Sequence, residues 1–389
     1  MRGVQTDGRL ARRAGADEPV NAFARAREGA GEAVLDLSDA NPTRHGLTHP
    51  RLAEVLAMTL ERVGVYEPDP HGPRAAREAL AALHGGHPDD YWLSASTSEA
   101  YSWLLTVTCD PGDAVAVPVP GYPLVEPLAR FAGVRTVGYP LFYVHPHGWS
   151  VDTDALARVL AAPDVRALVV VSPGNPTGAY LEPGTTEVVA GLCAEHQVTL
   201  VADEVFGPFF LDRGEAAPSL AAVGGDVTVA VLDGLSKSLA APQLKVAWLR
   251  LSGPDRERAA LAGALDTVAD AYLSVSAPVA GALPDLLGLL DDQVIRVRTR
   301  VATNLATART VLDAPCRVRR VDGGWTALVD VPRTRDDDTL TEHLLHDAHL
   351  SVHPGWLYDL SDPSTLALSL LLDPDRFADG CRRLRASVV

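Results

Sequence analysis

The stretch from Val165 to Phe206 reads VRALVVVSPGNPTGAYLEPGTTEVVAGLCAEHQVTLVADEVF. It contains an apolar run of strand length at 165–173, a helical pattern at 185–196 and a second apolar run at 198–206. Continuously apolar strands joined by a helix are typical of a parallel sheet that is covered by helices on both faces, whereas a half-exposed antiparallel sheet would alternate apolar and polar residues. The stretch therefore predicts an α/β fold.

The same alternation of strands and helices continues on both sides of this stretch. Four further strands are predicted, at 114–119 (AVAVPV), 134–141 (VRTVGYPL), 227–235 (VTVAVLDGL) and 246–253 (VAWLRLSG). One long helix is then expected from Leu283 to Leu312, followed by shorter strands and helices between 317 and 385. The chain should therefore form a large domain with a mostly parallel central sheet sandwiched by helices, plus a small α+β domain.

We expect three segments along the chain. Residues 1–48 should form an N-terminal arm and part of the small domain, residues 49–285 the large domain, and residues 286–389 a linking helix and the rest of the small domain. Residues up to about Val34 are expected to be a mobile arm followed by a short helix in VNAFARAREGA, at 20–30.

Composition excludes several classes of partner. The 389 residues are 47% apolar and carry a net charge of −16, which argues against nucleic acid or an anionic membrane as a partner. The four cysteines show neither metal-ligand spacing nor the framework of a secreted disulfide protein, so no metal is expected and a cytoplasmic location fits best. We find no signal sequence and no run of about 18 apolar residues.

Polar side chains stand at the ends of three predicted strands: Asn175 in SPGNPTG, Asp203 in VADEVF and Lys237 in DGLSK. Ligands of parallel sheets gather at the carboxyl ends of the strands, so the three should face one crevice. Lys237 and Lys245 are the only lysines in a chain whose other long cations are arginines. A lysine amine can lose its proton in a dry site and attack a carbonyl carbon, which arginine cannot do. Taken singly, each residue also suits a turn, a helix cap or a solvated surface.

A helix start and an aromatic residue add to this constellation. The segment WLSASTSEAYSWLL places Ser96, Thr97 and Ser98 where backbone N–H groups and the helix dipole attract phosphate, although an ordinary N-terminal cap is the alternative. Tyr122, in VPGYP, offers an aromatic face or simple loop packing. Together, the residues describe a site for an aromatic, phosphate-bearing cofactor that forms a Schiff base with a lysine.

With these motifs the chain resembles the fold-type I pyridoxal-phosphate (PLP) enzymes, class I/II aminotransferases, from about Asp36 to Leu384. The resemblance rests on NPTG at Asn175, on DEVF 28 residues later, on LSK ending a further 34 residues on, and on YEPDPHGPRAAREAL, GYP and GGW around them. It implies the fold-type I transferase fold, pyridoxal 5′-phosphate as cofactor, an amino acid or amine substrate, and a homodimer with shared active sites.

The resemblance also implies roles for individual residues. Lys237 would form the internal aldimine and shuttle the α-proton, Asp203 would hold the pyridine nitrogen protonated, and Asn175 would bond the ring O3′ and the substrate carboxylate. Tyr122 and Val205 would contact the two faces of the cofactor ring, and Phe206 would lie near O3′. The phosphate would be bound by Ser96, Thr97, Ser98, Lys245 and, across the dimer interface, Tyr66. Ala40, Asn41, Arg44 and Trp325 are expected beside the substrate.

The sequence departs from the family pattern at four positions. Phe206 replaces a tyrosine, Gly234 a phosphate-binding serine, Lys245 an arginine at the phosphate, and Ala367 the arginine that clamps the substrate α-carboxylate. We expect Arg44 to be the replacement clamp or else an ordinary surface residue.

The favoured function is a PLP-dependent aminotransferase acting on an amino acid or related amine. One alternative is a PLP-dependent lyase, cyclase or oxidase of an amino acid in specialised metabolism, because the same cofactor electronics serve all of these reactions. The other is a non-catalytic PLP-fold ligand-binding protein, against which the retention of Lys237, Asn175, Asp203 and Tyr122 argues.

Overall fold

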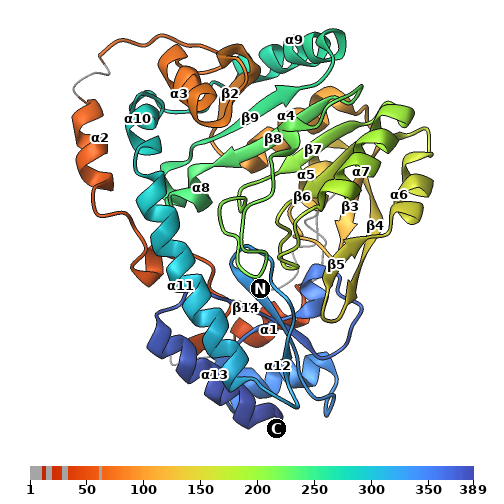
Figure 1. The fold of residues 1–389 in the computed structure, drawn as a ribbon, viewed down its shortest axis with the longest axis vertical. Helices are drawn as coiled ribbons and strands as arrows, with labels where there is room; N and C mark the ends of the chain where they lie inside the picture. Colours follow the sequence, from red (N-terminus) through yellow and green to blue (C-terminus); the bar gives the residue numbers. More distant parts are fainter. Residues whose placement is uncertain (1–10, 15–19, 29–33, 61–63) are drawn as a thin grey trace.

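An eight-stranded sheet lies at the centre of the structure, a computed structural model that describes residues 11–14, 20–28, 34–60 and 64–389 (Figure 1). In spatial order its strands are β2 (Tyr91–Ser94), β9 (Ala247–Ser252), β8 (Val229–Gly234), β7 (Thr199–Asp203), β6 (Val165–Val171), β3 (Ala114–Val119), β4 (Arg135–Val144) and β5 (Gly148–Val151). Strands β8, β7, β6, β3 and β4 run parallel, and β9 is antiparallel to both of its neighbours. The mostly parallel α/β sheet predicted from the apolar runs is confirmed.

Helices cover both faces of this sheet. One face packs against α4 (Thr97–Thr108), α5 (Val125–Ala132) and α9 (Asp255–Tyr272), and the other against α6 (Thr153–Leu160) and α7 (Pro183–His196). Neighbouring residues of β6 belong to the two different cores, Val169 to the first and Leu168 to the second, as the alternation of side chains along a strand requires. Burial on both faces explains why the strand sequence is apolar throughout. Three further helices, α2 (Leu52–Leu60), α3 (Arg74–His84) and α10 (Ala277–Leu287), pack together beside β2 and β9, and the short α8 (Leu235–Ser238) follows β8.

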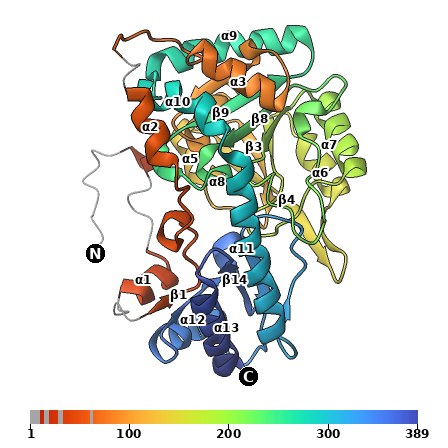
Figure 2. The same cartoon turned by 60° about the vertical axis from the view of Figure 1, so that its left-hand side comes forward.

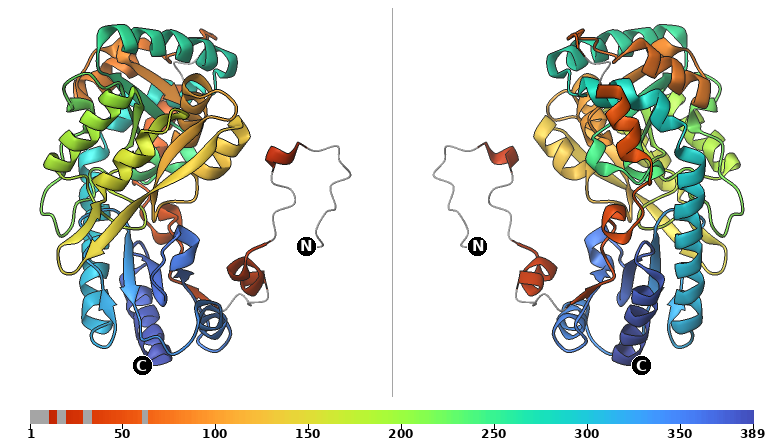
Figure 3. Two further views of the ribbon diagram at one scale, coloured as in Figure 1. Left: turned by 90° about the vertical axis from the view of Figure 1, so that its right-hand side faces the viewer. Right: turned by 90° about the vertical axis from the view of Figure 1, so that its left-hand side faces the viewer.

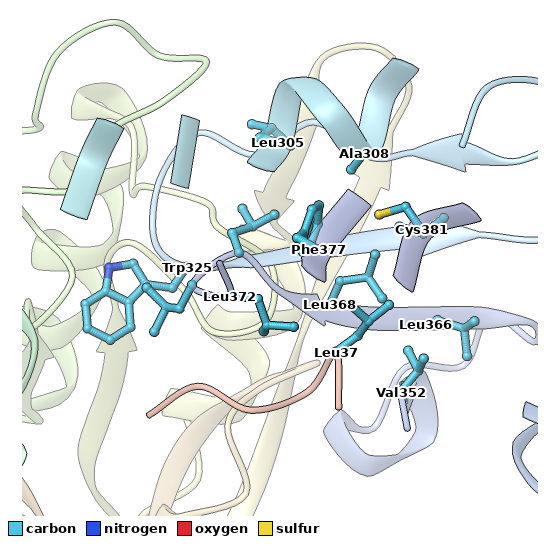
Figure 4. Packing of buried hydrophobic residues seen from close by; sticks show 14 of the residues in the cluster. Leu37, Leu305, Ala308, Trp325, Val352, Leu366, Leu368, Leu372, Phe377 and Cys381 are labelled. Atoms are coloured by element: carbon cyan, nitrogen blue, oxygen red, sulfur yellow. The ribbon is translucent and has the colours of Figure 1, made fainter. Parts of the chain in front are cut away.

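A second, smaller sheet lies below the first in Figure 1. Its antiparallel order is β10 (Arg317–Val318), β11 (Thr326–Asp330), β14 (Thr365–Ser369) and β13 (His353–Pro354), and a separate parallel pair joins β1 (Leu35–Asp36) to β12 (Leu350–Ser351). The helices around it are α1 (Ala22–Glu28), α11 (Leu290–Val311), α12 (Asp337–His346) and α13 (Pro374–Val388). Figure 4 shows the core that results, in which Leu37 from the N-terminal segment packs among residues of α11, β14 and α13.

The predicted long helix from Leu283 to Leu312 is wrong in one respect. The structure has two helices here, because α10 ends at Leu287 with Gly288 as its C-cap and α11 begins at Leu290. Glycine costs a helix interior about 1 kcal/mol relative to alanine, so Gly288 is a natural point for the break. Helix α11 then runs from beside the large sheet to the small one (Figure 2).

The segment that contains β1 lies beside the small sheet, where β1 pairs with β12 (Figure 3). Helix α1 is found where a short helix was predicted, and it packs on α12. Much of the expected mobile arm, at 1–10, 15–19 and 29–33, lies outside the described residues. The predicted domain boundaries after residues 48 and 285 stay predictions.

Candidate active site

A cavity of about 420 Å³ opens at the carboxyl ends of β6, β7 and β8, between the large sheet and β14 of the small one. Its volume falls within the usual size range of small-molecule sites, roughly 300–1,000 Å³. Twelve of the residues predicted for the site line it: Ala40, Ser96, Thr97, Ser98, Tyr122, Asn175, Asp203, Val205, Phe206, Lys237, Lys245 and Trp325. Residues far apart in the sequence thus meet at one edge of the sheet, as expected for strand ends of a parallel sheet.

Lys237 sits in the short helix α8, directly after β8. Its Nζ lies 5.4 Å from the centre of the Phe206 ring and 5.3 Å from that of the Trp325 ring. Burial lowers the pKa of Lys237, an effect that the nearby Asp203 partly opposes. The low-dielectric surroundings therefore favour the neutral amine, which is the nucleophilic form.

Asp203 is the last residue of β7 and is only 9% exposed. Its carboxylate accepts hydrogen bonds from the Tyr101 hydroxyl at 3.1 Å and from the Val205 backbone N–H at 3.2 Å. Burial raises the pKa of Asp203, while these hydrogen bonds and Lys237 oppose the rise. Sequence reasoning missed Tyr101, although it follows Thr97 by one helical turn and so shares its face of α4.

The N-terminus of α4 forms another wall of the cavity. Ser96 is its N-cap, with a side chain that accepts a hydrogen bond from the Glu99 N–H at 3.2 Å, so the ordinary capping role considered for this residue is present. Thr97 and Ser98, in the first turn, line the cavity together with Lys245, which is exposed and has a left-handed backbone with φ of 53°. A helix N-terminus and a cation in the same cavity make this the end that attracts an anion.

Two predicted residues of the opposite wall, Asn175 and Trp325, can donate further hydrogen bonds. Asn175 Oδ1 accepts a bond from the Thr326 hydroxyl at 3.3 Å, which leaves the amide N–H groups of Asn175 to donate elsewhere. Trp325 is 2% exposed, and its indole N–H has no hydrogen-bond partner among the described residues. Tyr122, by contrast, is 50% exposed at the rim.

The wall formed by the small sheet contains residues that sequence reasoning did not select. In the antiparallel pair of β13 and β14, His353 stands opposite Ala367, and both residues line the cavity. Within the described part of the chain, the lining of this cavity includes no arginine. The unpredicted polar residues of the lining are Ser38, Tyr101, Ser236, Thr326, His353, Tyr358 and Ser369.

Three predicted site residues are not among the residues that line the cavity. Asn41 caps the short 3₁₀ helix Pro42–His45, its Oδ1 accepting from the Thr43 N–H and hydroxyl at 3.1 and 2.7 Å. This turn carries Arg44 to the surface, where its side chain is 70% exposed and pairs with Asp39 at 3.3 Å. Tyr66 is 78% exposed, so only a second subunit could bring it to a site.

Glu204, next to Asp203 in the DEVF motif, is partly buried and is not among the residues that line the cavity. Its carboxylate accepts a hydrogen bond from the Leu220 N–H at 2.6 Å. Burial raises the pKa of Glu204 from 4.5 to about 7, so the carboxyl is protonated more readily in the folded protein than in the unfolded chain. The sequence offered no signal for this shift, because it comes from burial of the carboxyl in the folded chain, which the hydrogen bonds from Ser219 and Leu220 only partly oppose.

We expect the free energy of unfolding to decrease as the pH rises from the ordinary pKa of Glu204, 4.5, to its pKa in the folded protein, about 7. The unfolded state ionises first as the pH rises from 4.5 to about 7, so Glu204 lowers the unfolding free energy by up to roughly 3 kcal/mol across this window. Denaturant unfolding of the wild type and of Glu204→Gln at several pH values measures the effect. The variant keeps the acceptor for Leu220 and should gain stability relative to the wild type as the pH rises. Parallel pH profiles for the two proteins would contradict the prediction.

No helix in the described ranges is long and apolar enough to cross a membrane. No three histidine, cysteine, aspartate or glutamate side chains in that part of the chain converge as metal ligands would.

Comparison with known proteins agrees with the geometry. An arginine–pyruvate transaminase of Pseudomonas aeruginosa is 28% identical over 376 residues, covering 92% of this chain and 91% of that protein. An alanine aminotransferase of Mycobacterium tuberculosis is 29% identical over 280 residues, and this match spans 69% of the chain but only 64% of that relative. The solved structure of an alanine aminotransferase from Pyrococcus furiosus, 22% identical, superposes with a TM-score of 0.86 over 97% of this chain and 99% of that one. The family model for aminotransferase class I and II matches residues 45–384. The chain therefore belongs to the aminotransferase class I and II family, whose members use pyridoxal 5′-phosphate.

Proposed function

We propose that this protein is a PLP-dependent aminotransferase that removes the amino group from an amino acid or related amine and passes it to a keto acid. The observation that carries the proposal is the meeting of three groups in one cavity. These are the buried acid Asp203, the amine of Lys237 with its lowered pKa, and the anion-attracting start of α4.

The donor set fits each part of the cofactor. The hydrogen-bond donors to the buried Asp203 carboxylate, the Tyr101 hydroxyl and the Val205 N–H, are both neutral, and the protonated ring nitrogen of the cofactor would bring a positive charge into contact with it. The N–H groups at Thr97 and Ser98 and the cation of Lys245 would hold the phosphate. Lys237 would hold the aldehyde carbon.

The side chains around Lys237 would orient the ring and keep water out. Tyr122 and Val205 would contact its two faces, and Asn175 would donate to the ring oxygen through the amide that Thr326 leaves free. Phe206, in place of a tyrosine, brings no hydroxyl to that oxygen. Trp325, whose indole N–H has no hydrogen-bond partner among the described residues, would donate to the substrate, and Ala40 lines the same cavity.

When bound, the cofactor accepts the substrate nitrogen at its aldehyde carbon and withdraws electrons from the substrate carbon. The amine of Lys237 would take the proton from that carbon and return it on the cofactor side, because burial favours its neutral, basic form. Asp203 would hold the proton of the ring nitrogen, and so would stabilise the charge that develops there.

Finer features of the proposal rest on separate observations. A homodimer with shared sites is supported by a group of exposed apolar side chains after and within α2, namely Met58, Leu60, Val65 and Tyr66, with exposures of 52 to 78%. Tyr66 would then reach the phosphate of the partner's site. A cytoplasmic location is supported by four cysteines that are all buried and unpaired.

Single turnover of the cofactor-loaded protein tests the function. L-alanine and L-arginine, the amino donors named for two relatives, should each give equal amounts of keto acid and aminated cofactor. A product formed without aminated cofactor would point instead to the lyase, cyclase or oxidase reaction. Spectra that do not change with any amine would favour the ligand-binding alternative.

A further inference from the structure

The wall of the cavity that faces the substrate lacks a fixed positive charge. Among the described residues, the cations of the lining are Lys237 and Lys245, and the proposed function engages both with the cofactor. Arg27 is close to this wall, but it pairs with Asp36 at 2.9 Å. A substrate carboxylate therefore needs another partner here, because a buried anion without hydrogen bonds or a counter-charge costs several kcal/mol.

The register of the small sheet supplies a candidate. His353 and Ala367 stand opposite each other in β13 and β14. Residues directly opposite in an antiparallel pair point to the same face, with Cβ atoms about 4.5–5.5 Å apart. Ala367 packs beside Leu328, Tyr358 and Leu360 and, like His353, borders the cavity. Its methyl group takes up less of the cavity than a longer side chain at this position would.

The surroundings of His353 fix its ring. Its Nδ1 lies 2.9 Å from the Tyr358 hydroxyl, and Phe23 of α1 packs edge-on against the ring with centroids 5.2 Å apart. Among the described residues no hydrogen bond reaches Nε2. When the Tyr358 hydroxyl donates to Nδ1, Nε2 carries the hydrogen and is the donor left for a ligand in the cavity.

We propose that His353 is the specificity residue that binds the substrate carboxylate in this chain, held in position by Tyr358, and that it replaces the arginine which the family pattern places at Ala367. This inference rests on the proposed function, because it assigns a substrate contact within the same site.

A histidine in this role makes carboxylate binding depend on pH, whereas an arginine would not. Two charged groups act on the imidazole: Asp36 of β1 favours its charged form, and Arg27 of α1 disfavours it. Tyr358 is the titratable neighbour from the segment Gly355–Tyr358, and β14 contributes no titratable neighbour. Burial is the largest effect and lowers the pKa of free His353 below 6.5. A bound carboxylate raises that pKa again, so affinity is highest at low pH and falls as the pH rises from the free to the bound pKa.

Two aminooxy compounds test the assignment without turnover. Aminooxyacetate and O-methylhydroxylamine both attack the aldehyde carbon of the bound cofactor through a weakly basic nitrogen, but only the first carries a carboxylate. The rate at which each removes the visible absorption of the holoenzyme is measured from pH about 5 to about 8, the range in which histidine titrates. The rate for aminooxyacetate divided by the rate for O-methylhydroxylamine reports carboxylate recognition alone.

In the wild type the ratio should be about tenfold higher at the acid end, the usual scale for a hydrogen bond that gains a charge. His353→Gln keeps a donor and loses the charge, so its ratio should be lower and independent of pH. His147→Gln, an exposed histidine in the turn between β4 and β5, is the matched control and should behave as the wild type. Ala367→Arg should give a high ratio at every pH.

Several outcomes would overturn the assignment. A pH-dependent ratio that persists in His353→Gln would do so, as would a ratio lowered by Arg44→Ala instead. A wild-type ratio that does not vary with pH would also overturn the assignment. Equal rates for both compounds at every pH would remove the role of His353 and leave the proposed function intact. Failure of both compounds to react would count against the proposed function itself.

A direct titration gives an independent readout. The imidazole NMR signal of His353, identified as the one lost in His353→Gln, should titrate at a higher pH after reaction with aminooxyacetate than after reaction with O-methylhydroxylamine. Identical titrations in the two adducts would show that His353 does not contact the carboxylate.

Discussion

Lys237→Ala lowers kcat/KM for amino transfer by at least roughly 10⁴-fold, because the same amine is the nucleophile and the proton carrier in the proposed reaction. The fold should survive, since an alanine here removes a buried amine whose pKa burial lowers. Activity assays, together with thermal unfolding of the wild type and the variant, measure both effects.

The scarcity of lysine makes the covalent site easy to locate. Borohydride reduction of the loaded wild type should fix the cofactor to the peptide that contains Lys237, as read by mass spectrometry. Lys245→Ala removes the only other lysine and is the matched control: it should retain the adduct at Lys237 and bind the cofactor more weakly. An adduct that persists in Lys237→Ala would refute the assignment.

Asp203→Ala should lower kcat by roughly 10³-fold, with a smaller loss of cofactor affinity, because the carboxylate acts on charge that develops during the reaction. It also leaves the ring nitrogen of the cofactor without its counter-charge in a buried site. Single-turnover rates and cofactor titrations, measured separately, divide the effect between chemistry and binding.

Tyr101→Phe provides the graded comparison for Asp203. It removes one hydrogen bond at 3.1 Å from the carboxylate and leaves the charge in place, so a rate loss of roughly tenfold or less is expected. If Asp203→Ala lost no more activity than Tyr101→Phe, the carboxylate would not be the partner of the ring nitrogen.

Most of the large sheet followed from local pattern. Apolar runs such as Val165–Val171 predicted strands buried on both faces, and the helical patterns between them predicted the parallel connections. The pattern did not reveal β5, which pairs with β4 as a hairpin, or the break at Gly288. Both depend on how short segments pair and pack after the chain has folded, which periodicity does not report.

The convergence of the reactive groups could be inferred from the sequence. Parallel strands end at one edge of the sheet, so a parallel topology places Asn175, Asp203 and Lys237 together at that edge. Scarcity singled out Lys237, because among the long cations of this chain only a lysine can act as a neutral amine.

Which residues line the cavity depends on tertiary contacts. The turn that Asn41 caps directs Arg44 to Asp39 and the solvent, and the register of β13 with β14 places His353 opposite Ala367. The packing of α4 brings Tyr101 to Asp203. Cross-strand register and helix packing are set by contacts between segments far apart in the chain, and these leave no periodic signal in the sequence around the residues that they bring together.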